Sequence, residues 1–200
     1  MFKRRAILTM GLGAMASAGF AATPSFGWAE TVSPGLAPQG LAPVSGVAQS
    51  QFRSVAMNNL HTGESMEAVY WDGGDYVPDV LDAVNVHLRD YRTGDVHPID
   101  TRLLDLLDSV SQLTETKTPF EVISGFRSAR TNALLHERSA EVAQKSFHVQ
   151  GMAIDVRLPD VELRHLHAAA RSLGRGGVGF YPDSNFVHLD VGPVRSWSGT

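Results

Sequence analysis

Two short segments of this 200-residue chain alternate between apolar side chains and side chains that can bind a metal. The first is Met-Ala-Ile-Asp-Val at residues 152–156, and the second is Phe-Val-His-Leu-Asp-Val at residues 186–191. Successive side chains of a β-strand point to opposite faces. Each segment therefore predicts a strand with one apolar face for the core and a second face that carries Asp155, or His188 and Asp190. If the two strands are neighbours in one sheet, these polar faces converge on one point.

The rest of the chain between residues 52 and 191 alternates between strand and helix patterns. A Gly-containing link at residues 61–64 predicts a β-hairpin between residues 52–60 and 65–71. Apolar residues at helical spacing predict helices at 78–91, at 100–116 and, after Pro159, over residues 163–173, and a further helix is expected at 129–139. Further strands are expected at 120–124 and 178–181, the latter joined to 186–191 by a turn at 182–185. This order predicts an α+β fold with a small, largely antiparallel sheet flanked by helices.

The first 50 residues are not expected to belong to the folded domain. Lys3-Arg4-Arg5 precedes a Gly/Ala-rich apolar run from Ala6 to about Ala22, and a short stretch after Pro24 ends at Ala29, as in a secretory signal peptide over residues 1–29. The paired arginines fit twin-arginine export slightly better than the Sec alternative. Residues 30–50 contain repeated Pro and Gly and predict a flexible linker, so the domain is expected to cover residues 51–200. The apolar run is a poor membrane span, so a periplasmic protein without a stable span after processing is expected.

Two features of the composition limit the chemistry. There is no cysteine, which excludes disulfides and a Cys-ligated zinc, so any metal must be held by histidine and carboxylates. The net charge of −4 is not typical of a nucleic-acid-binding protein, which normally has a basic face.

Three residues form the candidate metal set: His148, Asp155 and His188. Two neutral imidazoles and one carboxylate leave a fourth position for water, which is the arrangement of a hydrolytic zinc centre, and such a centre lowers the pKa of bound water to about 7. His148 would approach from the loop before the first strand, where Gly151 lets the backbone turn. The spacing alone is not specific, because a histidine in a strand is commonly an ordinary hydrogen-bonded residue.

The succession of motifs over residues 52–197 resembles a known group of zinc peptidases. The chain is similar to the YcbK-like exported family of D-Ala-D-Ala carboxypeptidase/VanX-like zinc peptidases, which share a core with Hedgehog signalling domains. The motifs that carry the resemblance are Asn59-Leu-His-Thr-Gly-Glu64, Leu88-Arg-Asp-Tyr-Arg92, Ser124-Gly-Phe-Arg-Ser128, Thr131-Asn132, Ser146–Asp155, Gly176-Gly-Val-Gly-Phe-Tyr-Pro182 and Phe186-Val-His-Leu-Asp-Val-Gly192.

The resemblance implies site residues. It implies that the candidate metal set described above binds zinc and that Arg127 lies beside the substrate. There its guanidinium would polarise the scissile carbonyl and stabilise the developing oxyanion. The alternative for Arg127 is a surface ion pair. Ser146 is expected to hydrogen-bond the metal loop and to contribute to substrate binding.

The sequence departs from the family pattern at the general base. VanX-like enzymes have a glutamate three residues before the last ligand, where this chain has Asn185, and an amide cannot accept a proton. Asp190 is the first candidate for the base because it shares a strand face with His188, and Asp183 in the preceding turn is the second. Asp190 could instead orient the imidazole of His188.

The expected function is that of a periplasmic zinc metallopeptidase acting on peptidoglycan stem peptides. The resemblance favours an endopeptidase for cross-links that contain D-amino acids, such as D-Ala–diaminopimelate, with accessory cell-wall proteins as further partners. One alternative is a non-catalytic peptidoglycan-binding protein with a structural or vestigial zinc. Another is an amidase that cuts a different bond of the cell wall.

Overall fold

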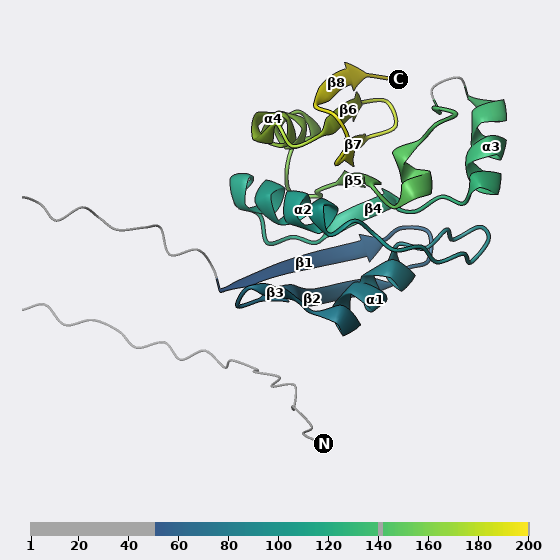
Figure 1. Cartoon of the computed structure of the whole chain (residues 1–200). Coiled ribbons are helices and arrows are strands. Elements are labelled where there is room, and N and C mark those ends of the chain that lie inside the picture. Colours follow the sequence, from purple (N-terminus) through teal and green to yellow (C-terminus); the bar gives the residue numbers. More distant parts are fainter. Residues whose placement is uncertain (1–50, 140–141, 200) are drawn as a thin grey trace, which may run out of the picture. The chain divides into compact units, whose positions relative to one another are not determined.

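The computed structural model describes residues 51–139 and 142–199 (Figure 1). The predicted signal peptide (1–29) and the predicted linker (30–50) therefore lie outside the described residues. No helix in the described part of the chain is long and apolar enough to cross a membrane.

The described residues form one eight-stranded sheet in the order β3-β2-β1-β4-β5-β7-β6-β8. Neighbours are antiparallel except for β1 with β4 and β6 with β8, which confirms the predicted α+β fold with a largely antiparallel sheet. The strands are β1 (Phe52–Asn59), β2 (Ser65–Asp72), β3 (Asp75–Tyr76), β4 (Phe120–Ser124), β5 (Ala153–Arg157), β6 (Gly177–Tyr181), β7 (Phe186–Asp190) and β8 (Arg195–Ser198). The predicted hairpin is confirmed as β1–β2.

The helices occupy the predicted regions, and the first three end earlier than expected. They are α1 (Pro78–His87), α2 (Thr101–Leu113), α3 (Ala129–Arg138) and α4 (Leu163–Leu173). α1 ends before the expected residue 91 because the Asp90 carboxylate accepts the backbone N–H of Arg92 at 3.0 Å, a local turn that competes with the helix. α2 begins after Asp100, whose carboxylate caps the backbone N–H of Arg102.

Three elements have no counterpart in the sequence prediction. These are the two-residue strand β3, the 3₁₀-helix η1 (Phe147–Gln150) and the final strand β8. η1 contains His148, and β8 returns the chain alongside β6. Both matter for the site described below.

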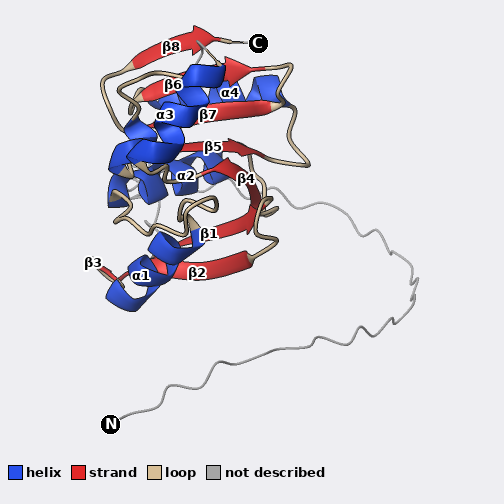
Figure 2. Cartoon of the chain, turned by 90° about the vertical axis from the view of Figure 1, so that its right-hand side faces the viewer, coloured by secondary structure: helices blue, strands red, loops and turns tan. Residues whose placement is uncertain are grey.

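The core lies between the sheet and the pair α2 and α4. Leu103, Leu107 and Leu166 of these helices are fully buried, as are Ile154 of β5 and Leu189 of β7. Figure 2 shows α2 and α4 behind the strands and α3 in front of them. Because side chains alternate along a strand, Asp155 and His188 point away from the α2–α4 core, toward the side where α3 and η1 lie.

Candidate metal centre

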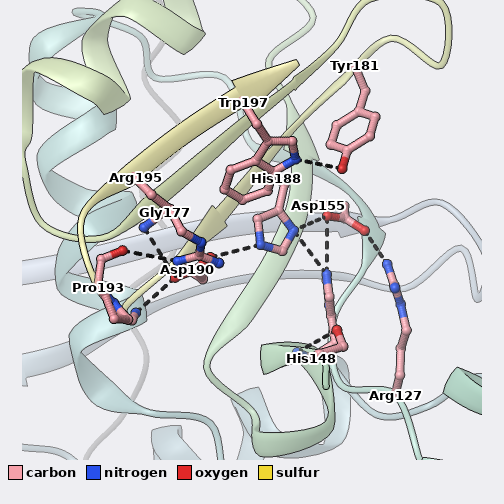
Figure 3. Close-up of polar contacts among 12 residues, drawn as sticks. Arg127, His148, Asp155, Gly177, Tyr181, His188, Asp190, Pro193, Arg195 and Trp197 are labelled. Atoms are coloured by element: carbon pink, nitrogen blue, oxygen red, sulfur yellow. Dashed lines mark hydrogen bonds and ion pairs between the residues drawn. The ribbon is translucent and has the colours of Figure 1, made fainter. Parts of the chain in front are cut away.

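Asp155 and His188 are direct partners across two neighbouring strands. β5 and β7 are antiparallel, and their register pairs Asp155 with His188. His148 reaches the same point from η1, and one ligand atom of each residue lies within 4.8 Å of the other two. The two strands are thus neighbours, which meets the condition for their polar faces to converge (Figure 3).

The remaining ring nitrogen of each histidine has a hydrogen-bond acceptor. His148 Nδ1 lies 2.7 Å from the backbone oxygen of Gly125. A carbonyl oxygen can only accept, so Nδ1 carries the proton and the lone pair of Nε2 faces Asp155 at 3.2 Å. His188 Nε2 lies 3.1 Å from Asp190, which leaves Nδ1 to face Asp155 at 2.8 Å. Two lone pairs and a carboxylate oxygen therefore converge.

This donor set fits a divalent metal. The two nitrogens that face each other, His148 Nε2 and His188 Nδ1, are 3.2 Å apart, and both are presented to a carboxylate. Metal-binding imidazoles commonly donate their other N–H to a carbonyl or a carboxylate, as both rings do at this site. Two imidazoles with one carboxylate are a set that suits zinc.

A metal requires neutral imidazoles and an ionised carboxylate, and the pKa shifts favour these states at His148 and Asp155 but not at His188. Burial lowers the pKa of His148 to about 4, so this ring is neutral at pH 7. Burial by itself would raise the pKa of Asp155, but its interactions with His148, Arg127 and His188 outweigh burial and hold this pKa well below its usual range. Burial would also lower the pKa of His188, yet its bonds to Asp155 and Asp190 raise it overall. Metal binding therefore releases a proton from His188 when that ring is charged.

Asp190 is fully buried and surrounded by donors. Its carboxylate accepts from His188, from both terminal nitrogens of Arg195 at 3.0 and 2.7 Å, and from the backbone of Gly177 and Gly192. Burial would raise the pKa of Asp190, but these hydrogen bonds lower it strongly. Of the two roles predicted for Asp190, these contacts favour orientation of the His188 ring over that of a base open to substrate.

Arg127 and Ser146 both contact the metal set. The Nε of Arg127 donates to Ser124 Oγ at 2.7 Å, and its NH2 pairs with the outer oxygen of Asp155. The guanidinium is therefore an internal partner of a candidate ligand, in place of the surface ion pair considered above. Ser146 Oγ accepts the backbone N–H of His148 and caps η1, which is the expected contact with the metal loop.

A cavity of about 330 Å³ opens over these residues. Its wall brings together cationic and aromatic side chains that the sequence did not assign to the site: Lys145, Arg195, Phe147, Tyr181, Phe186 and Trp197. Tyr181 was within reach of sequence reasoning because it belongs to a motif of the resemblance. Arg195 and Trp197 were not, because β8 was not predicted. Among the described residues that line this cavity, Asp155 is the only carboxylate.

Asp183, the second candidate for the base, and Asn185, at the position of the expected glutamate, both lie outside the cavity wall. Asn185 adopts a left-handed backbone conformation with φ of 53° and lines a different hollow, beside Glu121 and Arg157. Asp183 is exposed and is not part of the cavity wall. The position at which a glutamate was expected therefore does not face the metal set.

Comparison with known proteins gives consistent matches. The family model Peptidase_M15_2, described as peptidoglycan L,D-endopeptidase MepK, matches residues 47–197. Peptidoglycan L,D-endopeptidase MepK of Escherichia coli (strain K12) is 39% identical over 194 residues, which cover 97% of this chain and 96% of the relative. A probable peptidoglycan L,D-endopeptidase MepK of Haemophilus influenzae is 39% identical over 148 residues, which cover 74% of this chain and 80% of the relative. No solved structure gives a significant match.

Proposed function

The chain belongs to the peptidase family described as peptidoglycan L,D-endopeptidase MepK, and from that premise we propose that it is a zinc-dependent endopeptidase of peptidoglycan. The substrates are cross-links between stem peptides. The relatives' name specifies an L,D-endopeptidase, so the bond cut joins an L-centre to a D-centre. This replaces the D-Ala–diaminopimelate bond suggested by the resemblance.

The observation that carries the proposal is the convergence of His148 Nε2, Asp155 Oδ1 and His188 Nδ1 in the wall of a cavity. These atoms would hold zinc, which when bound supplies a Lewis acid and activates water at neutral pH. Gly125 and Asp190 fix the two rings from behind. The site therefore needs little rearrangement to bind an ion.

Arg127 has two roles in this proposal. Its bond to Asp155 orients the carboxylate so that the other oxygen faces the histidines. Arg127 also lines the cavity, where the N–H groups that it does not use on Ser124 and Asp155 would polarise the carbonyl of the bound peptide. Ser146 holds His148 in place at the start of η1 and lines the cavity beside the substrate.

A non-catalytic protein with a structural zinc is the second candidate, favoured by the lack of a glutamate at Asn185. A structural zinc normally has four protein ligands. Within the described residues the candidate ligand group has three members, which leaves a position for water and favours the peptidase.

Location and partners extend the proposal. A protein that acts on the cell wall works outside the cytoplasm, and the sequence of residues 1–29 suggests export to the periplasm through the twin-arginine pathway. Accessory cell-wall proteins remain candidate partners.

Digestion of purified sacculi tests the proposal. The protein is incubated with sacculi as purified, with a chelator, and with the chelator followed by excess zinc, and the released muropeptides are identified by mass. Release that is lost with the chelator and restored by zinc is the expected result. Release that persists in the chelator would exclude a metallopeptidase, and no release from any cross-link type with zinc bound would favour the binding protein. Fragments cut at the glycan–peptide linkage would identify an amidase.

A further inference from the structure

Tyr181, the last residue of β6, has a hydroxyl proton that no described protein group uses. Its Oη accepts the indole N–H of Trp197 at 2.8 Å. An indole nitrogen can only donate, so the direction of this bond is fixed. A phenol can also donate one hydrogen bond, and within residues 51–139 and 142–199 Tyr181 donates to no acceptor. Since Tyr181 lines the cavity, this proton is available to a bound ligand.

The hydroxyl is held by residues of three strands. The ring of Tyr181 stacks on Phe186 of β7 with centroids 4.6 Å apart. Trp197 of β8 lies over Gly179, where a Cβ would come within 2.7 Å of the indole. The indole centroid is also 5.3 Å from that of the His188 ring. The Tyr181 side chain therefore loses little freedom when it meets a ligand.

The other donors near the metal set are partly committed. Arg127 uses its Nε and one NH2 group on Ser124 and Asp155, and Arg195 uses both terminal nitrogens on Asp190. Figure 3 shows Tyr181 and Arg127 on either side of Asp155, with the Tyr181 hydroxyl directed toward the Asp155–His188 pair. A peptide carbonyl placed over this pair would meet the Tyr181 proton.

We propose that Tyr181 is a further catalytic residue, which donates a hydrogen bond to the scissile carbonyl oxygen as that oxygen becomes negatively charged, and that Trp197 positions it. The inference rests on the proposed peptidase function. Water adds to the carbonyl carbon while the carbonyl π electrons move onto the oxygen. The oxygen electron pair then re-forms the C=O bond while the C–N bond breaks with its electron pair going to nitrogen, which takes up the proton released by the water. Tyr181 keeps its proton throughout and stabilises the oxyanion together with Arg127.

A second tyrosine, whose hydroxyl has a purely structural role, provides the comparison for Tyr181. Tyr76 of β3, at the far edge of the sheet, donates to Asp105 Oδ2 at 2.8 Å. Its proton is used inside the protein, whereas that of Tyr181 is not. Tyr76→Phe is therefore the matched control for Tyr181→Phe, because both remove one tyrosine hydroxyl that takes part in hydrogen bonding within the protein.

The test combines kinetics with ligand binding on the zinc-loaded protein. Loss of one oxyanion donor typically lowers kcat by about 10²–10³-fold, so Tyr181→Phe should lower kcat on a purified cross-linked muropeptide by about 100-fold, with KM changed by less than about threefold. The Kd of a phosphinate analogue of the cross-link, whose tetrahedral anion stands for the oxyanion, should rise at least about tenfold. Zinc affinity should be unchanged, and Tyr76→Phe should match the wild type in all three measurements.

Trp197→Phe tests the positioning role. It removes the N–H but keeps a ring over Gly179 and His188, and it should lower kcat by about tenfold at unchanged KM. If Trp197 acts through Tyr181, the double variant should be no slower than Tyr181→Phe alone. Independent, multiplicative losses would contradict the positioning role.

The outcomes distinguish the catalytic role of Tyr181 from the proposed peptidase function. One outcome is that the wild type cuts the cross-link and Tyr181→Phe differs from it by less than about threefold in kcat and in phosphinate Kd. This result would overturn the role of Tyr181 and leave the proposed peptidase function intact. A wild type that cuts no cross-link with zinc bound would overturn both.

Discussion

Each side chain of the metal set is fixed by a contact on the side away from the site. His148 donates to Gly125, His188 donates to Asp190, and the outer oxygen of Asp155 pairs with Arg127. These contacts select the ring tautomers and the carboxylate orientation that leave three free electron pairs facing one another. Because none of the three anchors belongs to the candidate ligand group, substitution of an anchor should change metal affinity before it changes chemistry.

The role of Asp190 can be decided by Asp190→Asn. The amide would bind His188 Nε2 less well and leave Arg195 without its buried anion, so zinc affinity should fall by about 10–100-fold and the melting temperature should fall with it. A competitive titration with a chromophoric chelator measures the affinity. Asp183→Asn makes the same chemical change in the exposed turn and should leave zinc affinity as in the wild type. Full zinc affinity with abolished turnover in Asp190→Asn would instead identify the base.

At the scale of elements, the short helix η1 carries His148 to the strands and is closed by Gly151. This glycine has φ of 67°, a left-handed conformation that is unfavourable for other residues. A Cβ on it would come within 2.2 Å of the backbone oxygen of Pro98. The segment before α2 therefore touches the turn that leads from His148 into β5.

Gly151→Ala should displace this turn. Gly174, at the end of α4, has a similar φ of 59°, but a Cβ added there would meet nothing within 4 Å, so Gly174→Ala measures the backbone cost alone, about 1 kcal/mol. Gly151→Ala should lower the free energy of unfolding, measured in urea, by clearly more than Gly174→Ala does. It should also weaken zinc binding, whereas Gly174→Ala should leave zinc affinity unchanged. Equal losses of stability in the two variants would show that the contact with Pro98 adds nothing.

At the scale of the whole molecule, buried hydrogen bonds join segments that are distant in sequence. Asp90, which is 1% exposed, accepts from the backbone N–H and the hydroxyl of Ser128 and so connects the segment after α1 to the start of α3. Burial would raise the pKa of Asp90, but the hydrogen bonds of Thr131, Ser128 and Arg92 lower it to about 2. Folding is therefore favoured by the ionised form of this carboxyl.

The hydrogen-bonded carboxylate of Asp90 predicts that the fold is sensitive to acid. The pKa of Asp90 is lower in the folded state than its ordinary value of 3.8, so its contribution is complete above pH 4–5 and is lost as the pH falls toward 2. That contribution is about 2 kcal/mol, of which about 1 kcal/mol should be gone by pH 3. Asp90→Asn should lower the free energy of unfolding at pH 7, and its difference from the wild type should narrow by about this amount at pH 3.

Urea unfolding at pH 7, 5 and 3 measures the difference. Asp72→Asn, at the exposed end of β2, makes the same charge change without a buried network. The prediction would be contradicted if the difference in free energy of unfolding between the wild type and Asp90→Asn were the same at pH 7 and pH 3.

The sequence by itself determined the local elements and the chemistry of the site. Alternation at period two placed Asp155 and His188 opposite the apolar faces of their strands, and helical spacing located α1 to α4. The absence of cysteine restricted the ligands to histidine and carboxylate. Such patterns are readable because they reflect only the burial of one face of a strand or helix.

Only the tertiary structure decided which segments meet. The register that sets Asp155 against His188 and the parallel return of β8 along β6 depend on pairing between segments far apart in the chain. That pairing buries Asp190 against Arg195, brings Trp197 to Tyr181 and turns Asn185 away from the metal set. Neither Asp183, the second candidate for the base, nor Asn185 lines the cavity, because residues in a turn follow the backbone geometry of the turn and not the periodicity of the strand.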